Sequence, residues 1–363
     1  MDSHTDQRAL ERTDFLAKTG WDDADCMALG QDASTRRYFR LKRGDDTALL
    51  MDAPRIEDEP CPPDADEATR HEMGWNATSR LASSRVDAFT SMSDYLVEDG
   101  LSAPKVYASD WESGFAILED FGDGREFARL IERGEEDELK LYKEASKVLV
   151  HFHRRPAPTK IGTWPVLDYD RLALEVNAHL FAEWLPQHDD RFETSDEMWR
   201  DWTEVRDGLI AQALELPRNL ILRDYHAENL LWLPDREGLA RVGLIDFQDA
   251  INGWDGWELA MLVQDARRDV SNEAHDLVLR TYAEGTGKDE AGLRKRLAIC
   301  GTLNALRITG LFARLQERDK KPRYGLFMPR QQYLLAENLK HPALADMARF
   351  VRTYAPFIFD VNP

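Results

Sequence analysis

The stretch LRDYHAENLLW, residues 222–232, is the most informative part of this 363-residue sequence. It places Asp224 five residues before Asn229, and an apolar run follows Asn229 directly. After a turn-forming segment, PDREG at 234–238, a second apolar run leads to Asp246 within LIDFQ, residues 244–248. Two short apolar runs around such a turn predict a β-hairpin. Because hairpin strands are antiparallel, we expect Asn229 and Asp246 to meet at one end of it, beside Asp224.

These three side chains match the requirements of phosphoryl transfer from ATP. A carboxylate, here Asp224, can orient an attacking hydroxyl and accept its proton. An amide oxygen and a second carboxylate, from Asn229 and Asp246, are hard oxygen ligands that suit Mg²⁺. An aspartate beside a turn is more often a cap or a surface residue, so the spacing alone is weak. The combination of spacing, hairpin and second acid favours an active site.

The residues before this stretch predict a small β-rich lobe. Alternating or apolar runs indicate strands near 27–29, 37–42, 47–51, 105–109 and 114–118, with helices near 8–19 and 88–99. The segment 57–67 is acidic and rich in proline, so we expect a mobile loop or insertion that does not pack. Residues 119–124, EDFGDG, form a polar connector with two glycines that is suited to a hinge.

From about residue 126 the apolar spacing becomes helical. It predicts helices near 136–154, 169–184, 197–216, 258–269, 274–284, 290–318 and 329–339, interrupted by the hairpin. A chain of this length usually forms two domains or lobes. We therefore predict a bilobal α+β fold, with a small β-rich lobe over 1–121 and a large, mainly helical lobe over 122–363.

The composition is acidic, because 67 Asp and Glu residues oppose 47 Lys and Arg residues and give a formal net charge of −20. Such a charge repels nucleic-acid phosphates and anionic lipids, which argues against binding to nucleic acids or membrane surfaces as the main role. The longest uncharged stretch, 297–306, is too short to cross a bilayer, and residues 1–20 contain no apolar signal-peptide core. The three cysteines show no paired spacing. We expect a cytoplasmic protein.

Several stretches along nearly the whole chain resemble one protein family. They are DASTRRYFRL (32–41), MDAP (51–54), GFAILEDFGD (114–123), RDYH (223–226), IDFQDA (245–250), GLFARL (310–315), KPRY (321–324) and HPAL (341–344). In these stretches the chain resembles the aminoglycoside phosphotransferase branch of the protein-kinase-like superfamily. Within that branch it resembles the bacterial N-acetylmuramate/N-acetylglucosamine anomeric sugar kinases. The resemblance implies a protein-kinase-like fold with ATP and Mg²⁺ bound between an N-terminal nucleotide-binding lobe and a C-terminal catalytic and acceptor-binding lobe.

The resemblance also implies roles for individual residues. Asp224 would be the catalytic base, and Asn229 and Asp246 would hold Mg²⁺. The residues that would cover the ATP phosphates are Ser34, Thr35, Arg36 and Arg37, and those that would line the adenine are Glu119, Asp120 and Phe121. The acceptor would be a small-molecule hydroxyl, preferably the anomeric hydroxyl of an N-acetylated amino sugar of cell-wall recycling.

The chain departs from the family pattern at several positions. Leu222 replaces the histidine that commonly stands two residues before the base, which bears on the rigidity of the loop. The third predicted strand, with ALLM at 48–51, lacks the lysine that pairs with the ATP α- and β-phosphates in typical kinases. Arg37 or Arg40 could supply that cation, or both could be solvated strand arginines. Glu258 occupies the place of a usual aspartate, which is a mild change.

Six other side chains are candidates for contact with the acceptor: Glu183, Trp184, His226, Gln248, Trp254 and Trp257. Pyranose rings present apolar faces to aromatic rings, which makes the tryptophans candidates. Each tryptophan has a structural alternative, because a tryptophan near a helix end is more often part of the core. The residue at 226 is more often one that braces the loop by hydrogen bonds than an acid or base.

Two other functions remain open on the sequence alone. The chain could phosphorylate an aminoglycoside, choline or a related alcohol with the same fold. It could instead be a nucleotide-binding pseudokinase or scaffold. The missing strand lysine and Leu222 favour the pseudokinase, whereas the intact Asp224, Asn229 and Asp246 oppose it.

Overall fold

The computed structural model describes residues 3–30, 36–55, 61–82 and 84–361, with the side chains of the first helix described from Gln7 onward. Its N-terminal part is built on a five-stranded antiparallel sheet in the order β1-β2-β3-β5-β4. The strands are β1 (Asp25–Ala28), β2 (Arg37–Arg43), β3 (Asp46–Asp52), β4 (Val106–Asp110) and β5 (Phe115–Glu119). They confirm the five predicted strands, with ends displaced by at most two residues.

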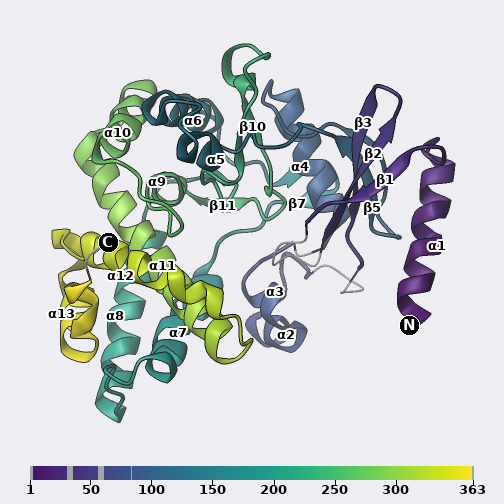
Figure 1. The fold of residues 1–363 in the computed structure, drawn as a ribbon. Coiled ribbons are helices and arrows are strands. Elements are labelled where there is room, and N and C mark those ends of the chain that lie inside the picture. Colours follow the sequence, from purple (N-terminus) through teal and green to yellow (C-terminus); the bar gives the residue numbers. More distant parts are fainter. Residues whose placement is uncertain (1–2, 31–35, 56–60, 83, 362–363) are drawn as a thin grey trace.

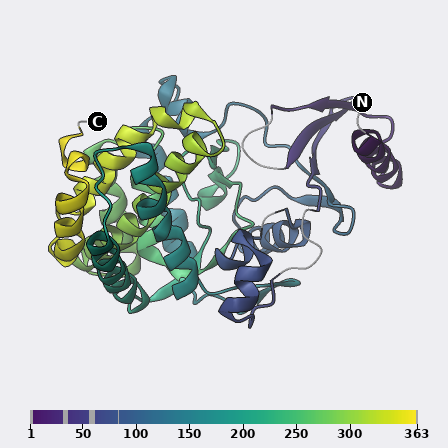
Figure 2. The ribbon, with the colours of Figure 1, turned by 90° about the horizontal axis from the view of Figure 1, so that it is seen from below.

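Helices pack on both faces of this sheet (Figure 1). Successive side chains of a strand point to opposite faces, so β3 contributes to two separate cores. Leu50 lies in a small core with Phe15 of α1 (Ser3–Lys18). Met51 lies in the main core with Phe89 of α4 (Val86–Glu98). Seen from below, the sheet and α1 form one end of the molecule and the helical remainder forms the other (Figure 2).

The remainder of the chain is mainly helical, as predicted. Its longer helices are α6 (Glu138–Phe152), α7 (Arg171–His188), α8 (Asp196–Leu214), α9 (Asp255–Val263), α10 (Asn272–Thr286), α11 (Glu290–Glu317), α12 (Met328–Asn338) and α13 (Ala345–Tyr354), with the short α5 (Phe127–Glu132) before them. Helix α11 is the central element and packs along α7. At their crossing, Gly310 lies against the backbone of Leu180, where a Cβ atom would collide. The glycine therefore permits the close approach of the two helices.

Three two-stranded ribbons join these helices. They are β6 (Lys160–Ile161) with β7 (Trp164–Pro165), β8 (Arg218–Ile221) with β11 (Ile251–Trp254), and β9 (Leu230–Trp232) with β10 (Val242–Leu244). The β9–β10 ribbon is the predicted hairpin. The β8–β11 ribbon was not predicted, and it brackets the chain segment that contains the hairpin. Ile221 and Ile251, at the two ends of that segment, are therefore held next to each other.

Other features also differ from the sequence-based expectations, and among them α5, α13 and the β6–β7 ribbon were not predicted. Helix α9 ends at Val263 rather than near residue 269. Two helices, α2 (Glu67–Met73) and α3 (Trp75–Thr78), follow the proline-rich segment and were not predicted. Within that segment, residues 56–60 lie outside the described residues. The expectation of a non-packing loop is wrong for its later part, because the Arg80 guanidinium donates hydrogen bonds to the carbonyls of Pro62 and Pro63, at 3.3 and 3.1 Å.

The predicted division after residue 121 remains a prediction. The main core contains residues from both sides of that position. For example, the rings of Phe89 and Phe247 stack with their centroids 4.9 Å apart. Within the part of the chain that the structure describes, no helix is both long enough and apolar enough to cross a membrane.

Candidate active site

The β9–β10 hairpin brings two of the predicted site residues to one end. Leu230 pairs with Leu244, and the backbone N–H of Ile245 donates to the carbonyl of Asn229 at 3.1 Å. Asn229 therefore directly precedes one strand, next to the residues that lead from the end of the other strand to Asp246. The geometry expected from the antiparallel register is confirmed.

Asp224 lies at the same end of the hairpin. The amide nitrogen of Asn229 donates to the backbone carbonyl of Asp224 at 2.9 Å, which fixes the spacing of the two residues. The side chain of Asp224 is 33% exposed and that of Asp246 is 41% exposed, so both carboxylates can be reached from solvent. The three predicted residues thus converge at an accessible place.

The loop around Asp224 is held in an uncommon backbone conformation. Arg223 has φ = +74°, a region that disfavours residues with a Cβ atom. Two residues near the start of α9 hold the Arg223 backbone in this conformation by hydrogen bonds. The Glu258 carboxylate accepts a hydrogen bond from the backbone N–H of Arg223 at 2.9 Å, and the indole of Trp257 donates to the Arg223 carbonyl at 3.0 Å. Neither contact was anticipated from the sequence.

Asp246 also has a left-handed backbone, with φ = +58°. Its Oδ1 atom accepts from the guanidinium of Arg36 at 2.8 Å and from the amide of Gln248 at 3.1 Å. Gln248 in turn donates to Asp249 at 3.3 Å, and Asp249 accepts from the backbone N–H of Ala82 at 2.6 Å. Burial raises the pKa of Asp249, and the positive charge of Arg223 opposes that shift.

The donor atoms present fit a magnesium ion. The amide nitrogen of Asn229 makes both hydrogen bonds that the structure gives to this side chain, which leaves the amide oxygen for a cation. The Arg36 guanidinium beside Asp246 shows that a positive charge is accommodated at this carboxylate. In the described ranges, no group of three or more His, Cys, Asp or Glu side chains could hold a metal. The oxygen atoms of Asn229 and Asp246 suit Mg²⁺, which uses few protein ligands and completes its shell with phosphate oxygens and water.

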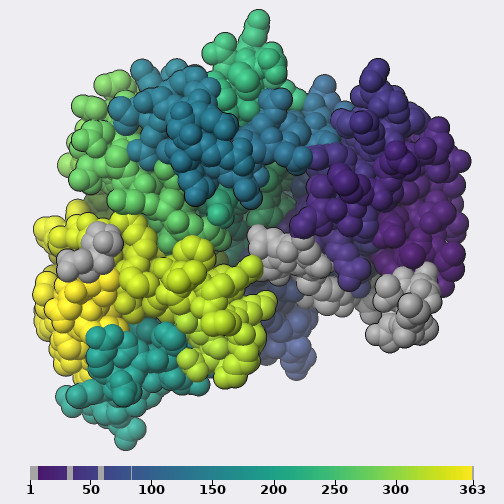
Figure 3. Space-filling view, viewed as in Figure 1, coloured from purple at the N-terminus to yellow at the C-terminus, as the bar shows by residue number. Residues whose placement is uncertain are grey.

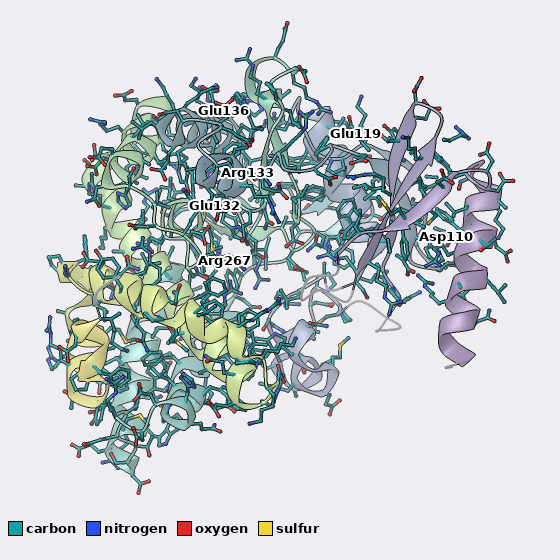
Figure 4. The ribbon with its side chains drawn as sticks, in the orientation of Figure 1. Asp110, Glu119, Glu132, Arg133, Glu136 and Arg267 are labelled. Atoms are coloured by element: carbon teal, nitrogen blue, oxygen red, sulfur yellow. The ribbon has the colours of Figure 1, made fainter. Side chains whose placement is uncertain are left out.

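The predicted adenine-lining residues lie at the junction between the sheet and the helical part, where Glu119 is marked (Figure 4). The Arg236 guanidinium binds Glu119 at 2.5 Å and lies 5.0 Å from the centroid of the Phe121 ring. Asp120 binds Arg40 at 2.6 Å. This connector is therefore fixed by two arginines, and contact between its backbone and adenine remains a prediction.

The structure distinguishes the arginines considered for the phosphates. Ser34 and Thr35 lie outside the described residues. Arg40 is held by Asp120 and by Asp123, the latter at 2.5 Å, at the hinge rather than near Asp246. The Arg37 side chain is exposed on β2. Of the candidates that can be placed, Arg36 lies beside the predicted metal site.

The six candidates for acceptor contact fall into three groups. Trp254 and Trp257 are 0% and 1% exposed and lie in the core with Tyr169, so neither offers a ring face to a sugar. Here the structural alternative holds and the proposed sugar contact is wrong. His226 and Gln248 are also buried, next to Asn229 and Asp246 respectively. Glu183 is exposed, and Trp184 is partly buried against Phe312.

One residue near the site was not found from the sequence. Arg307 of α11 places its Nη2 atom 3.9 Å from Oδ1 of Asp224. Asn304, one turn earlier, accepts from the same guanidinium at 3.1 and 3.3 Å and orients it. An arginine inside an otherwise apolar helix, LAICGTLNALRITGLFA over 297–313, was the signal available. A second such arginine, Arg314, follows seven residues later.

Arg267 belongs to the same surroundings. It lies near the centre of the molecule (Figure 4) and binds Glu228 at 3.0 Å, within the loop that links Asp224 to Asn229. The space-filling view shows deeper-lying green atoms between the purple sheet and the yellow-green helices (Figure 3). The loop that contains Asp224 is thus contacted from α9, from α11 and from the segment after α9.

Solved structures of kinases share this fold. A choline/ethanolamine kinase family protein from Mesorhizobium loti is 15% identical, has a TM-score of 0.57, and is matched over 96% of this chain and 99% of its own. The ADP-bound aminoglycoside phosphotransferase APH(2'')-Ib is 12% identical, has a TM-score of 0.55, and is matched over 92% and 99%. At these identities the likeness establishes the protein-kinase-like fold alone.

Sequence comparison goes further. The N-acetylmuramate/N-acetylglucosamine kinase of Caulobacter vibrioides is 42% identical over 357 residues, which are 96% of this chain and 97% of the relative. The kinase of the same name from Pseudomonas aeruginosa is 28% identical over 349 residues, 93% of this chain and 91% of the relative. Residues 25–297 match the phosphotransferase enzyme family, APH. The resemblance seen in the sequence is thereby confirmed, and the chain belongs to the phosphotransferase enzyme family.

Proposed function

We propose that this chain transfers a phosphoryl group from ATP to a hydroxyl of an N-acetylated amino sugar, preferably the anomeric hydroxyl. The relatives matched along almost their whole length are named as kinases of N-acetylmuramate and N-acetylglucosamine, which supports this class of acceptor. Membership of the phosphotransferase family supports the reaction. The observation that carries the proposal is the convergence of Asp224, Asn229 and Asp246 at one solvent-accessible end of the hairpin.

Each of the three residues has one task in the proposed reaction. Asp224 orients the acceptor hydroxyl and accepts its proton at a carboxylate oxygen. Asn229 and Asp246 would hold Mg²⁺ through oxygen atoms, and the bound ion neutralises charge on the phosphates. Arg36, which lies beside Asp246, would bind phosphate oxygens. Most of the rate enhancement comes from positioning and charge neutralisation, since the base contributes about 10²–10⁴-fold.

The strained loop is part of this proposal. A left-handed arginine directly before the base costs free energy, and such backbones persist only where surrounding contacts impose them. Glu258 and Trp257 supply those contacts to Arg223. Their task is to aim Asp224 at the acceptor, which replaces the bracing expected from the histidine that is Leu222 here.

The test is phosphoryl-transfer profiling with a panel that contains N-acetylglucosamine, N-acetylmuramate, choline and kanamycin. We expect turnover with the amino sugars and loss of turnover in Asp224→Asn, which keeps the shape of the side chain. The variant should still bind nucleotide in a thermal-shift assay. Turnover of choline or kanamycin without turnover of the amino sugars would refute the acceptor class. ATP binding without turnover of any acceptor would favour the pseudokinase, and full activity of Asp224→Asn would remove the assigned base.

A further inference from the structure

Two arginines lie on one face of α11, and the first of them reaches Asp224. Arg307 and Arg314 are seven residues apart, which in an α-helix is two turns and about 10 Å along the axis. Arg307 reaches the Asp224 carboxylate at 3.9 Å. Arg314 lies over the ring of Trp75 in α3, with its guanidinium carbon 5.1 Å from the ring centroid.

Three contacts connect the segments around Asp224 into a ring. Arg307 joins α11 to the loop that contains Asp224, and Arg314 joins α11 to α3. The third contact joins that loop to the residues after α3, because the Arg223 guanidinium donates to the carbonyls of Ser79 and Arg80, each at 3.1 Å. The loop, the α3 segment and α11 therefore form a ring of contacts, with Arg307 at its reactive end and Arg314 at its far end.

Arg314 is the unusual member of this ring. Its side chain is partly buried, and its Nε atom is buried without a hydrogen-bond partner. Among the described side chains, no carboxylate comes within ion-pair distance of it. Burial and the neighbouring positive charge of Arg318 lower the pKa of Arg314, and the negative charges of Asp319 and Glu183 oppose that shift. Its buried Nε is therefore a hydrogen-bond donor that no described group uses, and a carboxylate from outside the chain would satisfy it.

We propose that Arg314 binds a carboxylate of the acceptor whose reactive hydroxyl lies at Asp224. This inference rests on the proposed function, because it assigns the two ends of one amino sugar to the two ends of this ring of contacts. N-acetylmuramate carries a carboxylate on a short ether substituent, whereas N-acetylglucosamine is the same sugar without that substituent. Arg307 and Arg314 lie about 10 Å apart along the helix axis, which is on the scale of a pyranose ring with such a substituent. Arg314 is thus the residue that favours the acidic sugar over the neutral one.

The chemistry of the two arginines suits these two places, with Arg314 at the carboxylate of the sugar and Arg307 near its reactive hydroxyl. Guanidinium groups bind carboxylates through two parallel hydrogen bonds, and the unpartnered Nε of Arg314 is one of the donors required. Stacking on Trp75 holds the guanidinium plane in place before the ligand arrives. Arg307 is already engaged by Asn304, so it is oriented toward Asp224 and the reactive end.

The experiment compares Arg314→Gln with Arg318→Gln in the full chain. Arg318 directly follows the same helix, is 55% exposed and is paired with Asp319 at 2.7 Å, which makes it a matched control. We measure kcat and KM for N-acetylmuramate and N-acetylglucosamine, and the affinity for N-acetylmuramate by calorimetry. In Arg314→Gln the ratio of kcat/KM for the acidic over the neutral sugar should fall about 10- to 100-fold, with the loss in KM. In Arg318→Gln the ratio should stay within about twofold of the wild-type value.

The outcomes separate this inference from the proposed function. An unchanged ratio in Arg314→Gln, or equal losses for both sugars, overturns the assignment of Arg314 while the sugar kinase stands. A wild-type protein that uses only the neutral sugar overturns it as well. Turnover of neither sugar refutes the proposed function itself. Should Arg314→Gln not fold, as thermal melting would reveal, Arg314→Lys keeps the charge without the paired donors and should give an intermediate ratio.

Discussion

The carboxylate of Glu258 accepts a hydrogen bond from the backbone N–H of Arg223, with 2.9 Å between Oε1 and the nitrogen. Glu258 is completely buried, and Arg223 directly precedes Asp224. Burial raises the pKa of Glu258 to about 8, while hydrogen bonds from the backbone of Arg223 and Leu222 act in the opposite direction and the charge of Asp224 adds to the rise. The residue that braces the loop is therefore mostly a neutral acid at pH 7.

The raised pKa of Glu258 predicts a pH-dependent stability. In the folded chain Glu258 keeps its proton up to about pH 8, whereas the unfolded chain releases it near the ordinary value of 4.5. Its contribution to stability is therefore fully present below pH 4.5 and is lost as the pH rises toward 8, with a slope of up to about 1.4 kcal/mol per pH unit. Urea denaturation of Glu258→Gln between pH 5 and 8 should give a flatter dependence than the wild type. Equal slopes for both proteins would contradict the buried neutral acid.

The indole of Trp257 should matter for turnover more than its position in the core suggests. Trp257→Phe keeps an aromatic ring and removes the hydrogen bond to the Arg223 carbonyl. We expect a loss of stability of about 2–4 kcal/mol and a fall in kcat with little change in the KM for ATP. Trp254→Phe is the control, because Trp254 is equally buried but its indole nitrogen has no partner among the described residues. A similar fall in kcat in both variants would mean that the hydrogen bond does not position the loop.

A buried carboxylate at the end of β3 forms an ion pair with an arginine of the N-terminal helix α1. Asp52 is 0% exposed and accepts from Nε of Arg8 in α1 at 2.8 Å, while Arg12 is 3.8 Å away. Arg8→Met would leave that carboxylate buried without its close partner, at a cost of about 3–5 kcal/mol. Arg12→Met should cost less than about 1 kcal/mol, because the distance is long. Chemical denaturation measures both, and equal losses would argue against the specific pair.

The parts of the site that depend on local sequence were predictable. Asn229 and Asp246 were placed together because a turn between two apolar runs and an antiparallel register are local features. The five strands of the sheet could be located for the same reason. Arg36 was included in the phosphate-binding loop only through the family resemblance, and its contact with Asp246 joins residues 210 positions apart.

The features that were missed or predicted wrongly depend on contacts between segments far apart in the sequence. The β8–β11 ribbon pairs Arg218 with Trp254, and each strand has only four residues, so neither shows a periodic pattern. Proximity in sequence to Asp246 made Trp254 and Trp257 candidates for the acceptor, yet the ribbon and α9 turn both rings into the core. Arg307 lies 83 residues after Asp224, and only the packing of α11 brings the two together.

The ion pair between Arg36 and Asp246 makes a prediction about nucleotide binding. In this structure the Arg36 guanidinium lies 2.8 Å from the carboxylate that we assign to Mg²⁺. The proposed site requires Arg36 to move from Asp246 to the phosphates when the nucleotide binds with its metal. Arg36→Ala should therefore weaken the affinity for ATP in the presence of Mg²⁺ by about tenfold or more, since it removes a charge-assisted hydrogen bond.

The affinity for adenosine, which has no phosphates, should stay the same in Arg36→Ala. Calorimetric titration of both ligands measures the difference, and Arg43→Ala is the control, because this arginine lies at the other end of β2 and contacts Asp23 and Asp46. Equal losses for ATP and adenosine would show that Arg36 supports the fold of the site rather than the phosphates, and no loss for either would leave the missing strand lysine without this replacement.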